Sequence, residues 1–204
     1  MSPLIYAHRG IWQSLEEQNS LQSIEATRRC GFGVETDFRN HENSLVICHD
    51  PCRDSNFLTV DEIDFSEIPV ALNIKEDGLL DHYESFLKKY PNKFTFLFDG
   101  SIPEMVKIRE KGLPHALRLS EYENELPWES KFLWIDGFHT DWWIKSPRVF
   151  ELLEKHFVVF VSPELHGRDA ESAWEFFNVL HSKRIAQFGI CTDNPHELKA
   201  EINA

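Results

Sequence analysis

Phe157-Val158-Val159-Phe160-Val161-Ser162 is a run of five apolar residues that ends in a polar one. An apolar run of this length without alternation is typical of a strand buried on both faces of a parallel sheet. Short runs of the same kind recur along the chain, at Leu4–His8, Val34–Phe38, Ala71–Lys75, Phe94–Asp99, Ala116–Leu119, Phe132–Asp136 and Phe188–Thr192. We therefore expect eight buried parallel strands.

Helical patterns separate these runs. One set of apolar residues repeats at helical spacing, namely Leu79, Leu80, Tyr83, Phe86, Leu87 and Tyr90. Ser101-Ile102-Pro103-Glu104 combines a capping box with a proline in the first turn. Ser146-Pro147 and Asn194-Pro195 indicate two later helix starts. Trp174, Phe177 and Leu180 form the apolar face of another helix.

Eight strands that alternate with helices predict an α/β protein, a compact (β/α)₈ TIM barrel. We expect residues 1–204 to form a single catalytic barrel domain, since a chain of this length fits one domain. Polar residues close most of the predicted strands, as at the catalytic rim of such a barrel: His8, Asp37, Lys75, Asp99, Asp136, Ser162 and Thr192. A doubly wound open sheet is the alternative, although the sequence has no glycine-rich phosphate loop to support it.

The charge balance restricts the partners. A formal net charge of −13 disfavours nucleic acid and anionic membrane surfaces, because both are bound by neutralising phosphates with lysine and arginine. No apolar segment approaches the roughly 20 residues needed to span a bilayer, so we expect no stable membrane insertion. Residues 1–6 do not resemble a secretory signal. We expect a cytoplasmic protein with a small-molecule partner.

Glu35 and Asp37 are two residues apart on a predicted strand, so both side chains point to one face. Two neighbouring carboxylates are costly to ionise together without a cation between them. Taken alone, the pair could equally be two solvent-facing residues of an edge strand. His8-Arg9 lies at the end of the first predicted strand, and His49 follows the apolar run Leu45-Val46-Ile47-Cys48. Together they favour a metal site with acid–base chemistry and a phosphate-binding arginine.

The chain resembles the glycerophosphodiester phosphodiesterase family and, more distantly, the sphingomyelinase D-like and phosphatidylinositol phospholipase C barrels. The motifs that carry the resemblance occur in order: His8-Arg9-Gly10, Asn19-Ser20, Glu35-x-Asp37, His49-Asp50, Asn73-Ile74-Lys75 and Thr192-Asp193-Asn194-Pro195. They span nearly the whole chain, although its middle half matches only as a barrel pattern.

The resemblance implies a role for each of these residues. His8 and His49 would be the acid–base pair, and Glu35 and Asp37 would be ligands of one Mg²⁺ or Ca²⁺. The substrate would be bound by Arg9, which would hold the phosphate, and by Lys75 and Asn19.

Three departures from the family pattern bear on this site. Gln18 stands where the family has glutamate, and Asn73 stands where it has a third metal carboxylate. An amide oxygen still binds a hard cation, so Asn73 remains a candidate ligand of lower affinity. Only about twenty residues separate His49 from the third predicted strand, where relatives carry a substrate-covering insertion. The resemblance therefore implies a more open site and a substrate other than a small glycerophosphodiester.

The segment from Ser162 to Arg168 follows the seventh predicted strand and contains Glu164. Glu164 is a candidate contact for the distal part of the substrate, and a charged surface turn is an equal alternative. For Trp142-Trp143 we favour core packing over a substrate-stacking wall.

The sequence thus favours a metal-dependent phosphodiesterase that hydrolyses a glycerophosphodiester or a similar polyol phosphodiester. A catalytically decayed barrel that binds a phosphorylated metabolite is the rival, and the net charge disfavours a nuclease. The sequence leaves open the two alcohols, the choice of water or a substrate hydroxyl as nucleophile, Mg²⁺ or Ca²⁺, the oligomeric state, and a role in lipid metabolism or in making a surface polymer.

Overall fold

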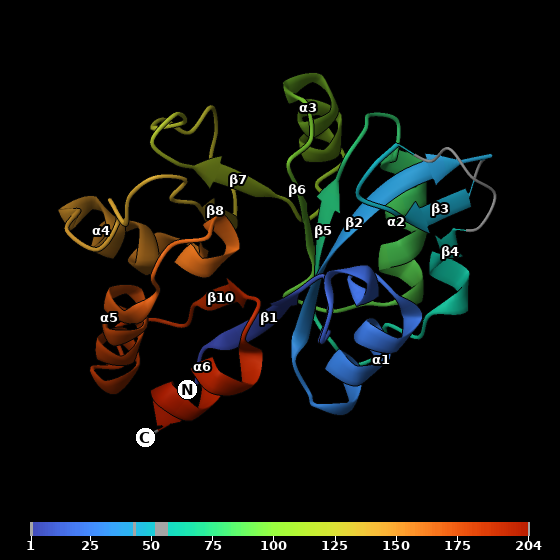
Figure 1. Cartoon of the computed structure of the whole chain (residues 1–204). Coiled ribbons are helices and arrows are strands. Elements are labelled where there is room, and N and C mark those ends of the chain that lie inside the picture. Colours follow the sequence, from blue (N-terminus) through green and yellow to red (C-terminus); the bar gives the residue numbers. More distant parts are fainter. Residues whose placement is uncertain (1, 43, 52–56, 204) are drawn as a thin grey trace. The chain divides into compact units, whose positions relative to one another are not determined.

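The structure, a computed structural model, describes residues 2–42, 44–51 and 57–203. Its contacts divide the chain into two compact units (Figure 1). The first unit is Ala7–His115, and the second unit is Met1–Tyr6 together with Ala116–Ala204. Strand β1, Leu4–His8, begins in the second unit and ends in the first. The expectation of a single domain over residues 1–204 stays a prediction.

The first unit alternates strands with helices. After β1 its elements are η1 (Leu15–Glu17), α1 (Leu21–Arg29), β2 (Gly33–His41), β3 (Ser44–Ile47), β4 (Leu58–Thr59), η2 (Val60–Glu62), β5 (Val70–Ile74), α2 (Leu80–Lys89), β6 (Phe96–Phe98) and α3 (Ile102–Glu110). β2 pairs in parallel with β5, and β5 with β6. The end of β2 pairs antiparallel with β3, which continues antiparallel to β4. The register of β2 and β5 sets Asp37 beside Asn73.

An aromatic cluster holds α2 against this sheet. Phe38 of β2 meets Phe86 of α2 edge to face, with ring centroids 5.9 Å apart. Phe65 packs edge to face on both Phe86 and Tyr90. The predicted helical stripe from Leu79 to Tyr90 is therefore the buried face of α2.

The second unit repeats the alternation. It contains β7 (Ala116–Leu119), β8 (Phe132–Ile135), α4 (Pro147–Lys155), β9 (Phe157–Val161), η3 (Pro163–His166), α5 (Glu171–Ser182), β10 (Gly189–Thr192) and α6 (Pro195–Asn203). Strands β7, β8, β9 and β10 pair in this order, all in parallel. Helices α4, α5 and α6 lie along one side of the strands of this unit (Figure 1).

Aromatic side chains also form the core of the second unit. Trp143 stacks on Phe177 of α5 at an interplanar angle of 7° and a centroid distance of 5.4 Å. It also contacts Phe160 of β9, and its side chain is fully buried. The expectation of core packing is thus confirmed for Trp143. The indole N–H of Trp142 donates to the carbonyl of Asp136.

All eight predicted strands are present, as β1, β2 and β5 to β10. The antiparallel pair β3 and β4 is additional and was not predicted. It prolongs β2 beyond the predicted end at Phe38, because residues Arg39 to His41 pair with β3. The predicted strand Phe94–Asp99 is shorter in the structure, where β6 covers Phe96–Phe98.

Two helix starts differ from the sequence patterns. Helix α1 was not predicted, because Ser20 forms its capping box with Ser23 instead of the usual Glu or Gln. At α3, Ser101 accepts a hydrogen bond from the N–H of Glu104 as expected. The Glu104 carboxylate does not return to the cap, because it is buried and accepts the N–H groups of Gly78 and Leu79. None of the described helices combines the length and apolarity needed to cross a membrane.

Candidate active site

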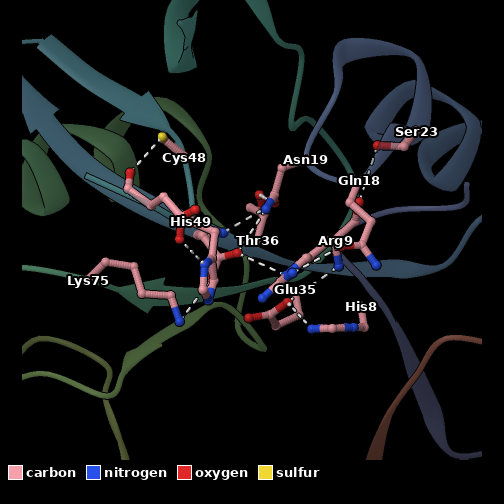
Figure 2. Close-up of polar contacts among 12 residues, drawn as sticks. His8, Arg9, Gln18, Asn19, Ser23, Glu35, Thr36, Cys48, His49 and Lys75 are labelled. Atoms are coloured by element: carbon pink, nitrogen blue, oxygen red, sulfur yellow. Dashed lines mark hydrogen bonds and ion pairs between the residues drawn. The ribbon is translucent and has the colours of Figure 1, made fainter. Parts of the chain in front are cut away.

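The candidate site belongs to the first unit and is centred on two carboxylates of β2. Glu35 and Asp37 are 1% and 0% exposed, so neither is the solvent-facing residue of an edge strand. Figure 2 shows the side chains of His8 and Arg9 beside Glu35, and Arg9 and Lys75 both form ion pairs with Asp37. The structure therefore brings five of the candidate residues together.

Asp37 is surrounded by positive charge. Its Oδ2 lies 3.0 Å from Nε of Arg9, and its Oδ1 lies 3.0 Å from Nζ of Lys75. The Asn19 amide donates a further hydrogen bond of 2.8 Å to Oδ2. Burial acts to raise the pKa of Asp37, but Lys75, Arg9 and Asn19 outweigh it and hold the pKa below its ordinary value. Asp37 is therefore ionised at neutral pH.

The pKa of Glu35 is shifted in the opposite direction from that of Asp37. Burial, and then the negative charge of Asp37, raise the pKa of Glu35 to about 7, against the opposing effects of His8, Lys75 and a hydrogen bond from Asn73. Nε2 of His8 lies 3.9 Å from Oε2 of Glu35. The His8 ring is thus next to a buried carboxyl group whose pKa is raised.

The turn after β1 fixes Arg9. Arg9 has a φ of 56°, in the left-handed region, and its backbone N–H donates to the Glu35 carbonyl. Gly10 follows with a φ of 88°, and a Cβ there would meet the Ser23 hydroxyl at 2.6 Å. Only glycine fits this position. The guanidinium then donates from Nη1 to the Gln18 side chain at 2.9 Å.

The side chain of Asn19 is hydrogen-bonded to Thr36 and Asp37 of β2. It has a φ of 57°, a conformation that asparagine tolerates better than most residues. Its amide N–H₂ binds Asp37, and its oxygen accepts the Thr36 hydroxyl at 2.6 Å. Both ends of this side chain are therefore occupied by β2. Its contact with substrate stays a prediction.

His49 follows β3, whose end lies beside β2, where the N–H of Cys48 donates to the carbonyl of Asp37. The His49 side chain is 49% exposed, and its Nδ1 lies 2.9 Å from Oδ1 of Asp50. Among the described residues, the ring forms no hydrogen bond or ion pair with Glu35 or Asp37. The structure places His49 beside Asp37 and Arg39 of β2, with its ring half exposed to solvent.

The side-chain oxygen atoms of Glu35, Asp37 and Asn73 are candidate ligands of a divalent cation. Among the described residues, no group of three histidine, cysteine, aspartate or glutamate side chains could hold a metal ion. Glu35 and Asp37 nevertheless share one face with Asn73, whose Oδ1 is buried and accepts no hydrogen bond within the described part of the chain. Two carboxylates and an unpartnered amide oxygen are hard ligands of the kind that Mg²⁺ and Ca²⁺ prefer. The donor set therefore fits such an ion.

Glu164, the last candidate, lies in the second unit at the start of η3. Its carboxylate accepts hydrogen bonds from the hydroxyls of Ser162 and Thr192 and from the N–H of Asp193 at 3.3 Å. The Trp174 indole donates to the Ser162 hydroxyl. Glu164 thus joins the ends of β9 and β10, and its role in substrate binding stays a prediction.

A second polar pair of this unit also lies at a strand end. The Asp136 carboxylate, after β8, accepts the N–H of Gly137 and lies 2.7 Å from Nε2 of His166. The sequence identified Asp136 as a strand-end residue but gave no partner for it.

Arg39 is the residue of the first unit that the sequence analysis missed. Its guanidinium binds the backbone carbonyls of His49 and Lys75. Its position in the sequence could have identified Arg39 as a site residue. Arg39 is two residues beyond Asp37 and therefore points to the same face of β2.

Comparison with solved structures identifies the fold. The chain superposes on a glycerophosphodiester phosphodiesterase from Agrobacterium tumefaciens with a TM-score of 0.70 and 13% identity, over 100% of both chains. The fold is that of the glycerophosphodiester phosphodiesterases. This likeness confirms the predicted fold class, a (β/α)₈ barrel.

Two other solved phosphodiesterases have the same fold. A glycerophosphoryl diester phosphodiesterase from Parabacteroides distasonis gives a TM-score of 0.62 and 14% identity, over 99% of this chain and 86% of that one. An Oleispira antarctica phosphodiesterase in complex with the product sn-glycerol-3-phosphate gives 0.63 and 14%, over 100% and 98%. No protein-family model and no curated protein matches the sequence.

Proposed function

We propose that the chain is a phosphoric diester hydrolase that acts on a glycerophosphodiester or a similar polyol phosphodiester. One observation carries this proposal: Arg9 and Lys75 flank the buried Asp37 at 3.0 Å each, and His8 lies beside the neighbouring carboxylate Glu35. The shared fold of three solved phosphodiesterases, one of them bound to sn-glycerol-3-phosphate, supports it.

The charges of the site suit a phosphate anion. Arg9 and Lys75 contribute two positive charges, and Asp37 contributes one negative charge. Gln18 accepts a hydrogen bond from Arg9 without adding the charge of a glutamate. The three charged residues therefore keep a net charge of +1. Arg9 and Lys75 are each about one-fifth exposed, so their charged groups can reach a bound phosphate.

The histidines supply the proton transfers. His8, whose ring lies beside the Glu35 carboxylate, is the first acid–base group. His49, half exposed and paired with Asp50, is the second group. One histidine deprotonates the nucleophile, and the other protonates the alcohol that leaves the phosphorus. The nucleophile is water or a neighbouring substrate hydroxyl, and a cyclic phosphate product, visible by ³¹P NMR, would identify the hydroxyl.

A divalent ion fits the same face of β2 and β5. Glu35, Asp37 and Asn73 would hold it, and Mg²⁺ or Ca²⁺ would supply polarisation of a phosphoryl oxygen. Arg9 and Lys75 already compensate Asp37, so we expect the ion to bind more weakly than in a site of three carboxylates.

The second candidate is a barrel that binds a phosphorylated metabolite without cleaving it. The observation that favours it is Asn73, which provides an amide where the resemblance implies a carboxylate. In that protein Arg9 and Lys75 would still bind phosphate, whereas His8 and His49 would be dispensable.

An assay of the turnover of bis(p-nitrophenyl) phosphate and of glycerophosphodiesters distinguishes a hydrolase from a binding protein. The assay compares Mg²⁺, Ca²⁺ and chelator, and wild type with His8→Ala and Glu35→Ala. His82→Ala on α2 and Glu25→Ala on α1 are matched controls. If the chain is a hydrolase, wild type and both control variants should turn over the substrates, and His8→Ala and Glu35→Ala should not. No turnover by a folded wild type that binds glycerol phosphate would support the binding protein.

A further inference from the structure

We propose that Arg39 is a positioning residue that sets the places of His49 and Lys75 in this site. The inference rests on the proposed function for its kinetic consequences, and on the contacts of the first unit for its structural ones.

Arg39 continues the row of functional side chains on β2. Glu35, Asp37 and Arg39 are separated by two residues each, so all three lie on one face of the strand. Glu35 and Asp37 lie at the centre of the candidate site. Arg39 lies where β2 has begun to pair with β3, its partner in register being Val46. It is thus next to both the strand that leads to His49 and the end of β5.

Every part of the guanidinium of Arg39 is used. Nε and Nη2 donate to the carbonyl oxygen of His49 at 3.2 and 2.9 Å, a bidentate grip on one backbone atom. Nη1 donates to the carbonyl of Lys75 at 3.2 Å and lies 3.3 Å from Oε2 of Glu76. Glu76 in turn accepts the N–H of Asn40 at 2.6 Å. Because the guanidinium of Arg39 donates its hydrogen bonds to other parts of the protein, we infer that Arg39 affects a substrate only through His49 and Lys75.

The two carbonyls that Arg39 binds belong to two site residues, His49, which follows β3, and Lys75, which follows β5. The ring of His49 is half exposed, and Asp50, its hydrogen-bond partner, is 88% exposed, so the ring contacts alone fix it weakly. The grip on the His49 carbonyl fixes the backbone from which this ring projects. Lys75 is held at its N–H by the Phe38 carbonyl and at its own carbonyl by Arg39.

A lysine cannot replace this arrangement. Its ammonium is a point donor, whereas the planar guanidinium reaches two carbonyls and a carboxylate at once. Arg39→Lys keeps the charge and loses the fork, and Arg39→Ala loses both. Arg29→Ala is the matched control, because Arg29 on α1 is 65% exposed and forms a surface ion pair with Glu25.

A double-mutant cycle tests the inference. Because small misplacement of a reacting group costs on the order of 100-fold, we expect Arg39→Ala to lower kcat by about 100-fold, with a smaller change in KM. Arg39→Lys should fall between Arg39→Ala and wild type. In a His49→Ala background, Arg39→Ala should cost clearly less than in wild type, because one of the two groups that it positions is gone and only the placement of Lys75 is lost. Arg29→Ala should leave kcat unchanged.

Two outcomes would overturn the inference. One is an unchanged kcat in folded Arg39→Ala and Arg39→Lys. The other is the same fold loss for Arg39→Ala with and without His49, which would indicate a general structural role. Should Arg39→Ala fail to fold, the comparison of Arg39→Lys in the two backgrounds decides.

A measurement without turnover separates this inference from the proposed function. The His49 ring signals in a ¹H–¹³C NMR spectrum should shift in Arg39→Lys, whereas those of His82 on α2 should not. Unchanged His49 signals would overturn the positioning role. An inactive wild type with shifted signals would remove the proposed function and keep the structural inference.

Discussion

Nζ of Lys75 lies 3.0 Å from Oδ1 of Asp37, across the pair of strands β5 and β2. This contact joins the end of one strand to the buried face of the next. Together with Arg9 on the opposite oxygen, it makes Asp37 a carboxylate that the protein itself compensates. Asp37 therefore holds the charged groups of Arg9 and Lys75 in place.

Asp37→Asn tests this compensation. The change leaves Arg9 and Lys75, both largely buried, without their carboxylate. Because breaking one partner of a buried ion pair costs about 3–5 kcal/mol, and these cations keep some solvent contact, we expect a loss of about 3 kcal/mol at pH 7. Urea unfolding measures it. Since the pKa of Asp37 is lowered, the difference should disappear as the pH falls below the folded-state pKa. An equal loss in the surface variant Glu25→Gln would show that the assay does not report on the buried pair.

Glu35→Gln should have the opposite pH dependence. The folded protein binds the Glu35 proton more tightly than the unfolded chain, so the free energy of unfolding falls as the pH rises from 4.5 to about 7. Gln imitates the protonated form. In chelator we therefore expect Glu35→Gln to be more stable than wild type at pH 8, by up to about 3 kcal/mol, and nearly equal to it at pH 4.5. A difference that is constant between these pH values would contradict the raised pKa.

Asn73→Asp should strengthen divalent-ion binding. The substitution gives the face of Glu35 and Asp37 a third carboxylate in place of the unpartnered amide oxygen. Because ligand charge tunes the affinity of such sites, we expect the Kd for Ca²⁺ or Mg²⁺ to fall by about tenfold in isothermal titration calorimetry. Asn178→Asp on α5 is the control for the added charge. Equal affinities of Asn73→Asp and wild type would argue against a metal at this face.

Glu164→Gln separates the two roles considered for Glu164. The carboxylate accepts hydrogen bonds from Ser162, Thr192 and Asp193, and charged hydrogen bonds contribute about 1.5–3 kcal/mol each. A purely bracing role predicts a loss of about 2 kcal/mol in unfolding free energy with an unchanged KM. A rise in KM at unchanged stability would instead assign Glu164 to the substrate.

The sequence predicts the eight parallel strands because most of them are short apolar runs, such as Phe157–Val161, and because a polar residue closes most of them. It does not predict β3, Ser44–Ile47, because this strand pairs antiparallel with β2 and β4 and stands outside the alternation of parallel strands with helices. The candidate residues on β2 follow from alternation along one strand. Their partners do not, because Asp37 meets Lys75 only through the register of two strands that are far apart in sequence. Arg39 was missed for the same reason, since both carbonyls that it binds belong to other segments.

The most direct test of the central claim is the rate of phosphodiester hydrolysis by His8→Ala and His49→Ala, with and without added imidazole. If the two histidines move the protons, each variant should lose at least about 100-fold in kcat, and imidazole should restore part of it, because general acid–base catalysis contributes on the order of 100- to 10,000-fold. A full rate in both variants, or no hydrolysis by the folded wild type with any metal, would contradict the account.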